Sequence, residues 1–274
     1  MNLICKVLKT SSSGYYHWRR VFSKKDLEAK QLAQKVKKAF RDSREAYGSP
    51  RVYRKLKQDG FRVSKKKIEK MMKILGLRAR KRRKYRPTTL SNHKETLSPN
   101  LVDRKFDRGE KGKVWLTDIT YLRIGRSWAY LAVVLDAHSR RAVGWSLESH
   151  MKSSLVLSAL RKSYARERPK EGLLLHSDRG SQYASKNYRD FIEMMKAKQS
   201  MSRKGNCWDN APMESFFDSL KCEYAHHESF QSLEEARRGL FWWIESFYNR
   251  QRLHSSLGYK SPACFEEKTM SDIA

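Results

Sequence analysis

Hydrophobic residues recur at helical spacing near the start of the chain. Leu32, Val36 and Phe40 stand at every fourth position, which places them on one face of a helix. Ser49 and Pro50 suit the N-cap and the first turn of a second helix, and a glycine ends that helix ten residues later. The pattern therefore predicts two consecutive helices, each with one apolar face.

A third helix is indicated by Ser64, a good N-cap, in front of the sequence KKKIEKMMKILG. Ile68, Met71, Met72 and Leu75 stand at i, i+3, i+4 and i+7 and predict one buried stripe. The lysines fall outside this stripe: Lys65, Lys66, Lys67, Lys70 and Lys73. Two short helices joined by a turn that contains glycine, with the second rich in lysine, are typical of a helix-turn-helix.

From residue 113 onward the pattern changes to that of strands. KVWLTDITYLRI, SWAYLAVVLDAHS and RRAVGWSLES are β-rich segments with minimal connections, which favours an antiparallel meander. A helical stretch, SSLVLSALRKSYARE, comes next, followed by the short strand EGLLLHS and two more helices, KNYRDFIEMMKAK and APMESFFDSLKCEY. The fold class expected from this order is α/β, a mixed sheet with helices packed on it.

Charge divides the chain into two parts. The 274 residues carry a net charge of +30, of which residues 1–90 contribute +23. Seven of the nine residues in RARKRRKYR (78–86) are basic, and such a run suits contact with phosphates better than a place in a core. A solvated helical bundle would explain a basic helix pair, but the basic run favours nucleic acid as the partner. The expected contacts come from Lys65, Lys66, Lys67, Lys70, Arg80, Lys81, Arg82, Arg83 and Lys84.

Several classes of protein do not fit the sequence. No apolar run approaches the ~20 residues that span a bilayer, and the apolar stretch at the N-terminus is short for a signal peptide. The four cysteines lack C-x-x-C spacing, so neither a disulfide framework nor a zinc knuckle is indicated. We expect a cytoplasmic protein that does not bind membranes.

Two aspartates interrupt apolar strand segments. Asp118 stands inside the first strand, where a charge costs free energy unless it is compensated. If residues 125 and 126 form a two-residue hairpin turn, Asp118 pairs with Val133, and Asp136 faces the other side of the sheet. Asp178 follows the leucines of the fourth strand, at the strand end where ligands of such sheets gather. This register makes Asp118 and Asp178 candidate site residues and excludes Asp136.

Glu214 is the third candidate acid. It stands in the first turn of a helix that buries Phe216 and Leu220, so that Glu214 and Lys221 lie on the opposite face. Taken singly, each acid has an ordinary interpretation as a turn residue, a cap or a first-turn residue. Three converging carboxylates repel one another unless a cation lies among them, and oxygen ligands of this kind suit Mg²⁺ or Mn²⁺. Two such ions are the standard device for phosphoryl displacement.

The C-terminal sequence FWWIESFYNRQRLH (241–254) is rich in aromatic residues. Near-helical spacing predicts that Phe241, Trp242, Ile244, Phe247 and Tyr248 pack a last helix onto the sheet, and stacking on nucleic-acid bases is the alternative.

Several of these segments resemble a known family. WLTDITYL, DAHSRRAVGW, HSDRGSQY, SRKGNCWDNAPMESFFDSLKCE and YNRQRLHSSLGYKSP are similar to the retroviral-integrase-like core of bacterial insertion-sequence transposases typified by insertion sequence three. REAYGSPRVYRKLKQDGFRVSKKKIEKMMKILGL looks like the helix-turn-helix that precedes this core, and the match runs from about residue 40 to 265. Thirty-five residues separate Asp178 from Glu214, a spacing typical of the family's D-D-E signature.

The resemblance implies a ribonuclease H-like fold with a five-stranded mixed sheet. The implied domains are a basic helix-turn-helix region (1–90), a linker (91–110), the catalytic core (111–225) and a helical tail (226–274).

The implied activity is that of a DNA transposase. Asp118, Asp178 and Glu214 would be the catalytic residues and the ligands of two Mg²⁺ or Mn²⁺ ions, and Lys221 would hold DNA beside them. A phosphodiester at the end of the element would be hydrolysed, and the freed 3′-hydroxyl would attack another DNA site. In the tail, the resemblance suggests DNA contacts for Asn249, Arg252 and His254.

The implied partners are double-stranded DNA, as terminal inverted repeats and as target, and further copies of the chain on that DNA. Family members are often joined to an upstream product with another helix-turn-helix, so a fusion to such a product or a complex with it is also expected. Two alternatives stay open. One is a nuclease of the same fold that cuts without joining, and the other is a non-catalytic DNA-binding repressor.

Overall fold

The computed structural model describes residues 2–7, 9–80, 97–203 and 206–271 and divides into two compact units, Met1–Arg80 and Lys81–Ala274. Within the described residues, no helix combines the length and the apolar composition needed to cross a membrane.

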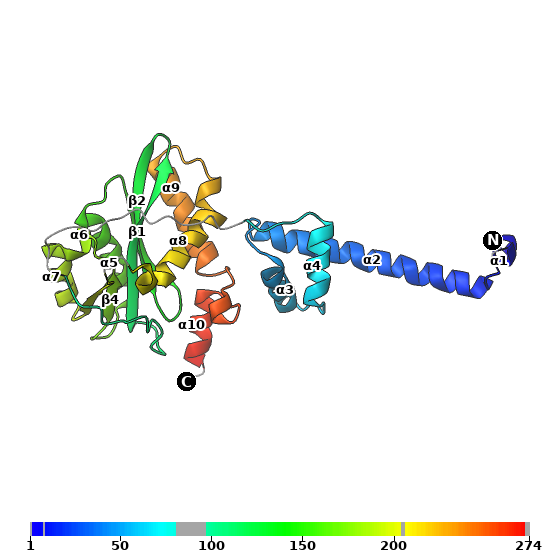
Figure 1. Ribbon diagram of the computed structural model, residues 1–274, viewed down its shortest axis with the longest axis horizontal. Helices are drawn as coiled ribbons and strands as arrows, with labels where there is room; N and C mark the ends of the chain where they lie inside the picture. Colours follow the sequence, from blue (N-terminus) through cyan, green and yellow to red (C-terminus); the bar gives the residue numbers. More distant parts are fainter. Residues whose placement is uncertain (1, 8, 81–96, 204–205, 272–274) are drawn as a thin grey trace. The chain divides into compact units, whose positions relative to one another are not determined.

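The first unit is helical. Its described helices are α1 (Asn2–Val7), α2 (Ser12–Asp42), α3 (Ser49–Gln58) and α4 (Lys65–Ile74). Figure 1 shows α3 and α4 beside the C-terminal end of the long helix α2, whose N-terminal part extends away from them. The predicted apolar faces meet in a small core, since Val36, Val52 and Ile68 are fully buried. The predicted helix-turn-helix is confirmed as α3 and α4.

The starts of these helices follow ordinary capping rules. The hydroxyl of Ser64 accepts a hydrogen bond from the backbone N–H of Lys67 (3.2 Å), so the predicted cap of α4 is confirmed. The prediction that Ser49 caps α3 is wrong by one residue. Gly48 is the N-cap, because its carbonyl accepts the first helical bonds and Pro50 occupies the first turn.

A mixed five-stranded sheet forms the centre of the second unit. Its strands are β1 (Val114–Ile124), β2 (Ser127–Asp136), β3 (Ala142–Glu148), β4 (Leu174–Ser177) and β5 (Lys198–Met201). Their order in the sheet is β3-β2-β1-β4-β5; β1 to β3 are antiparallel, whereas β4 and β5 run parallel to β1. The predicted ribonuclease H-like α/β fold is confirmed.

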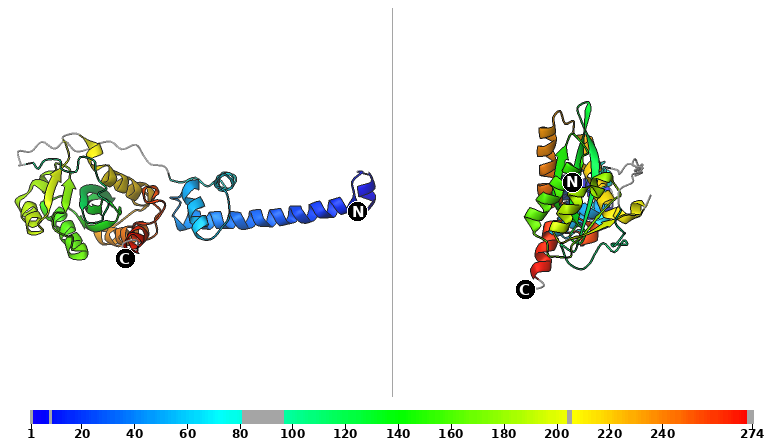
Figure 2. Two further views of the ribbon diagram at one scale, coloured as in Figure 1. Left: turned by 90° about the horizontal axis from the view of Figure 1, so that it is seen from below. Right: turned by 90° about the vertical axis from the view of Figure 1, so that its left-hand side faces the viewer.

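Helices cover both faces of this sheet, as Figures 1 and 2 show. The larger helices are α5 (Ser153–Glu167), α7 (Lys186–Met194), α8 (Ala211–Glu223), α9 (Leu233–Phe241) and α10 (Pro262–Ser271). Short elements complete the unit: α6 (Ser181–Ala184), η1 (Cys207–Asn210), η2 (Ala225–His227), η3 (Trp242–Tyr248) and η4 (Ser255–Leu257). Helices α5 to α7 pack on one face around Trp115, and α8 and α9 lie on the other.

The aromatic tail departs from the predicted helical spacing. Ile244, Phe247 and Tyr248 are buried as expected, but Phe241 is 59% exposed and Trp243, rather than Trp242, is fully buried. The buried face runs through Leu240, Trp243 and Phe247, so it passes beside Phe241, the last residue of α9, and Trp242, the first residue of the π-helix η3.

Candidate active site

Asp118 lies just beyond the point where β1 loses its parallel neighbour. The pairing of β1 with β4 covers Val114 to Leu116, and Asp118 follows two residues later. On its other side β1 pairs with β2, and Asp118 stands opposite Val133, so the predicted register is confirmed. The side chain of Asn210, at the start of α8, donates a hydrogen bond to the carbonyl of Thr117 (3.4 Å). This bond holds the N-terminus of α8 against the same edge of β1.

Asp178 follows the last residue of β4, and a tight turn fixes its carboxylate. The backbone N–H of Gly180 donates to Oδ1 of Asp178 at 2.9 Å. A Cβ atom on Gly180 would stand 3.0 Å from that oxygen and 2.8 Å from Oε1 of Gln182. A side chain at position 180 would therefore require the Asp178 carboxylate and the end of the Gln182 side chain to shift.

Glu214 reaches the site from α8. Phe216 and Leu220 face the core, and Glu214 in the first turn is half-buried, as are Asp218 and Lys221 further along the helix. The predicted separation of an apolar face and a charged face on this helix is confirmed. Burial and the charge of Asp218 raise the pKa of Glu214 above its ordinary value.

Asp118 is influenced by the charges of both other acids. Burial raises the pKa of Asp118 well above its ordinary value, and the negative charges of Asp178 and Glu214 raise it further. The N–H of Ile119, which donates to Oδ1 at 2.8 Å, and the cation of Lys221 act in the opposite direction but do not cancel this rise. Asp118 on β1 therefore responds to a carboxylate from the end of β4 and to another from α8.

A hard divalent cation fits this set of donors. All three acids offer oxygen atoms, which Mg²⁺ and Mn²⁺ prefer, and a cation between them would relieve the repulsion that raises the pKa of Asp118. In the part of the chain that the structure describes, no group of three or more His, Cys, Asp or Glu residues is already gathered closely enough to hold a metal ion. The three acids therefore suit a hard divalent cation by the chemistry of their oxygen atoms and by the effect of their charges on Asp118.

Lys221 connects the acids with an aromatic surface. Its pKa is lowered because burial outweighs the opposing effects of Asp218 and Asp118. Its Nζ lies 4.7 Å from the centroid of the Tyr121 ring.

His176, two residues before Asp178, is buried and held by two hydroxyl groups. Its Nδ1 lies 2.9 Å from Oγ of Ser200, and its Nε2 lies 3.1 Å from Oγ of Ser202. Burial lowers its pKa to about 4, so the imidazole is neutral at pH 7. His176 thus ties β4 to β5 beneath the turn that carries Asp178.

Asp209 is a buried residue near the site that sequence reasoning missed. Its carboxylate accepts hydrogen bonds from the backbone N–H and the guanidinium of Arg203, from Arg104 and from Asn100. These bonds, above all those from the Arg203 side chain, hold the pKa of Asp209 far below its usual range. Leu101 also donates its N–H to Oγ of Ser200 (2.8 Å), so residues 98–104 of the predicted linker are fastened to the second unit.

Asp136 lies apart from the acid cluster, as the register predicts. It pairs with Trp115 and is almost fully buried. Its carboxylate accepts hydrogen bonds from the N–H groups of Gly112 (2.7 Å), His138 (3.1 Å) and Ser139 (2.9 Å). Asp136 therefore closes the turn between β2 and β3.

The suggested DNA contacts in the tail are wrong, because all three side chains are buried. The amide of Asn249 bonds to both the N–H and the C=O of Ala142, as a neighbouring strand would. Arg252 forms a buried ion pair with Glu223 (2.6 Å), and it also contacts His254. These residues join the tail to the sheet and to α8.

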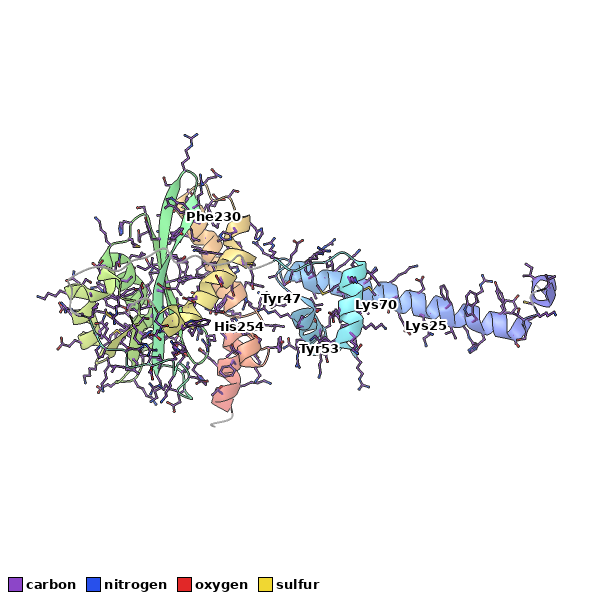
Figure 3. All side chains as sticks on the ribbon, viewed as in Figure 1. Lys25, Tyr47, Tyr53, Lys70, Phe230 and His254 are labelled. Carbon is purple, nitrogen blue, oxygen red and sulfur yellow. The ribbon has the colours of Figure 1, made fainter. Side chains whose placement is uncertain are left out.

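The predicted DNA-contact residues of the first unit lie on one helix and at the end of the unit. Lys65, Lys66, Lys67 and Lys70 are exposed on α4, and Figure 3 shows Lys70 there. Arg80 is half-buried, and its backbone N–H donates to the carbonyl of Glu45 (3.1 Å). The remaining four, Lys81, Arg82, Arg83 and Lys84, lie outside the described residues.

Comparison with protein families agrees with this architecture. Two models described as "Integrase core domain" match residues 109–207 and 195–262. A model described as "HTH-like domain" matches residues 27–85.

Individual relatives cover nearly the whole chain. A 31 kDa protein of insertion element IS600 from Shigella sonnei is 41% identical over 97% of this chain and 98% of its own length. The transposase InsF of insertion sequence IS3A from Escherichia coli K12 is 38% identical over 98% and 94%, respectively. Among solved structures, the magnesium complex of the HTLV-2 integrase catalytic core domain is 17% identical, with a TM-score of 0.43 over 57% of this chain and 97% of that one. On its sequence relatives and family matches, the chain belongs to the family of insertion-sequence transposases typified by IS3.

Proposed function

We propose that this transposase cleaves a phosphodiester at the ends of its own insertion element and joins the new 3′-hydroxyl to another DNA site, with Asp118, Asp178 and Glu214 as its catalytic residues. The observation that carries the proposal is the position of Asp118, a buried carboxylate on β1 whose pKa is raised by its burial and by the charges of Asp178, at the end of β4, and of Glu214, on α8. Such a cluster is costly for a fold to maintain unless it serves to bind cations.

Asp118, Asp178 and Glu214 would hold two Mg²⁺ or Mn²⁺ ions, which when bound activate the attacking oxygen and stabilise the leaving oxygen. Gly180 keeps the carboxylate of Asp178 oriented through its N–H. Lys221, beside Asp118, would neutralise a DNA phosphate next to the scissile bond.

The reaction consists of two exchanges at phosphorus. In the first, water attacks the phosphorus, loses a proton, and displaces the 3′-oxygen of the element strand as a hydroxyl. In the second, that hydroxyl attacks a phosphodiester of the target, so that one P–O bond forms while one breaks. Neither step needs a covalent link between protein and DNA.

DNA binding would begin in the first unit. The exposed lysines of α4 stand on the second helix of the helix-turn-helix, which is the helix that enters the major groove in such motifs. The transposases of IS3A and IS904 are named for their insertion sequences, and by analogy we propose that the partner DNA is the pair of inverted repeats of this chain's own element. Assembly of several copies on that DNA, alone or with an upstream helix-turn-helix product, belongs to the same proposal.

The test uses purified protein, duplexes that carry the inverted repeats next to the gene, a plasmid target, and Mg²⁺ or Mn²⁺. Wild-type protein should produce joined strands, and Asp178→Asn should produce none. Asp190→Asn is the matched control, because Asp190 is an exposed aspartate on α7 and its loss should leave joining unchanged. Joining by Asp178→Asn at the wild-type rate would disprove the site.

The same assay separates the alternatives. New 3′-hydroxyl ends that never become linked to the target would indicate a nuclease. A repressor would bind the duplexes without cutting them and would show no uptake of Mg²⁺ that depends on Asp118, Asp178 or Glu214.

A further inference from the structure

Two large aromatic side chains are exposed on the β1–β2 hairpin. Tyr121 is 40% exposed and Trp128 is 49% exposed. Their rings meet edge to face, with centroids 5.1 Å apart and an angle of 85° between the planes. Burying these rings would be favourable, so their exposure needs an explanation other than the stability of the core.

The register of the hairpin places both rings on one face. Trp128 pairs with Arg123, and Tyr121 stands two residues before Arg123 on the same strand, so all three side chains point to the same side. Arg123 and Arg126, at the tip, are both exposed. The hairpin thus presents aromatic faces among cations.

The tip of the hairpin is tied to the rest of the unit. The N–H of Gly125 donates to the carbonyl of Phe230 at 2.8 Å, and Phe230 is labelled in Figure 3. Gly125 has a φ of +55°, which a glycine adopts without strain. The aromatic face is therefore held in a fixed position on an anchored hairpin.

Lys221 joins this face to the acid cluster. Its ammonium group lies over the Tyr121 ring, and its charge also acts on Asp118. Tyr121 lies three residues after Asp118 on β1, so the two side chains project from opposite faces of the strand. Lys221 is the side chain that interacts with both of them.

We propose that Tyr121 and Trp128 form a stacking surface for an unpaired base of the DNA, on the other side of Lys221 from the candidate catalytic acids. This inference rests on the proposed function. Exposed aromatic faces among Lys221, Arg123 and Arg126 match a ligand that has both flat rings and phosphates, which is a nucleic acid. The base must be unpaired, because inside a duplex the neighbouring base pairs cover both of its faces.

Short duplexes with a three-nucleotide single-stranded extension at the terminal repeat, carrying 2-aminopurine in that extension, test the proposal. With Ca²⁺ in place of Mg²⁺ to prevent cutting, wild-type protein should quench the probe. Tyr121→Leu and Trp128→Leu should abolish the quenching and weaken binding by about 5- to 150-fold, the range for loss of one stacked base. Tyr121→Phe and Trp128→Phe keep a ring and should retain both.

Three controls keep the outcome interpretable. Thermal melting and circular dichroism show whether each Leu variant is folded. Fully paired duplexes without the extension should bind the Leu and Phe variants equally. Photocrosslinking of 5-iodouracil in the extension should label Tyr121 or Trp128, which a purely structural role would not produce.

Equal quenching and affinity in the folded Leu variants, or crosslinks only elsewhere, would overturn the inference. If Trp128→Leu instead changes the oligomeric state and leaves quenching intact, the rings form a protein contact and the inference is also wrong. Neither result would bear on the proposed function, which is tested separately by strand joining in wild type and in Asp178→Asn.

Discussion

Asp118 and Asp136 stand on paired neighbouring strands, and both have raised pKa values, yet their surroundings are opposite. N–H groups of the β2–β3 turn and of Gly112 surround Asp136, so its charge is satisfied by hydrogen bonds. Asp118 receives one such bond, from Ile119, and otherwise faces Asp178 and Glu214. A buried carboxylate surrounded by donors completes a fold, whereas one surrounded by other carboxylates is suited to a cation.

The largest effect is expected when Asp118 loses its negative charge, because strand joining should then be almost abolished. Asp118→Asn should lower strand joining by about 10³-fold or more, the scale on which catalytic residues act. The protein should stay folded and gain stability, because an amide beside Asp178 and Glu214 replaces a repulsive charge. Gel assays of joining and thermal melting in the absence of metal measure the two effects. A variant that melts earlier than wild type would contradict this account of Asp118.

The same substitution at the other aspartate should have the opposite result. Both oxygens of Asp136 accept hydrogen bonds, so the NH₂ group of Asp136→Asn meets an N–H donor in either orientation. We expect a loss of about 1–3 kcal/mol in the free energy of unfolding, the cost of an unsatisfied buried polar group. Joining per folded molecule should be unchanged. Urea unfolding at fixed pH measures the change in the free energy of unfolding. If Asp136→Asn is as stable as wild type, the β2–β3 turn does not require both carboxylate oxygens of Asp136.

Divalent ions should raise the free energy of unfolding by binding at Asp118. This rise should not depend on Asp136. At ten times its Kd, Mg²⁺ should raise the free energy of unfolding by about 1.4 kcal/mol in wild type and in Asp136→Asn. The rise should be much smaller in Asp118→Asn. Calorimetry with Ca²⁺ as a second ion checks whether the site takes hard cations in general.

The pH dependence of stability sharpens the same contrast. The folded pKa of Asp118 is raised, so without metal the folded state holds its proton more tightly than the unfolded state does. The contribution of Asp118 is therefore fully present below the ordinary aspartate pKa of about 3.9 and is lost as pH rises through the folded value. The stability of wild type relative to Asp118→Asn should fall over this window, and saturating Mg²⁺ should reverse the trend. A difference that does not vary with pH would be inconsistent with a raised pKa.

The smallest effect is expected from removing the charge of Lys221, the side chain that interacts with both Asp118 and Tyr121. Lys221→Met should weaken DNA binding several-fold and reduce the slope of log K against log salt by about one phosphate contact. Lys196→Met is the matched control, since Lys196 is exposed and pairs with Glu171 on the surface. An unchanged slope would remove Lys221 from the DNA interface.

The sequence predicts the parts of this fold that depend on local rules. Alternation and a two-residue turn were enough to place Asp118 opposite Val133, because the register of a hairpin follows from its turn. Helical periodicity likewise identified the exposed lysines of α4 and the charged face of α8.

Other features depend on contacts between distant residues, and these escaped prediction. The hydrogen-bond partners of Asp209 include Asn100 and Arg104, which lie more than a hundred residues earlier in the chain. The sequence next to Asp209 does not predict these contacts. Motif resemblance placed Arg252 near DNA, although its partner is the buried Glu223. The buried face of the aromatic tail runs through Leu240 and Trp243 rather than through Phe241 and Trp242, and the spacing of the aromatic residues alone does not distinguish these two faces.

The bonds at Asp209 also determine how the protein can be rebuilt. The carboxylate of Asp209 accepts hydrogen bonds from Asn100 and Arg104, which precede β1 in the chain. It also accepts one from Arg203, shortly before the helix that carries Glu214. A change in chain length ahead of Ser98 should therefore leave these bonds, and the start of the helix that carries Glu214, in place. The position ahead of Ser98 is therefore suitable for fusing a different DNA-binding domain to this core.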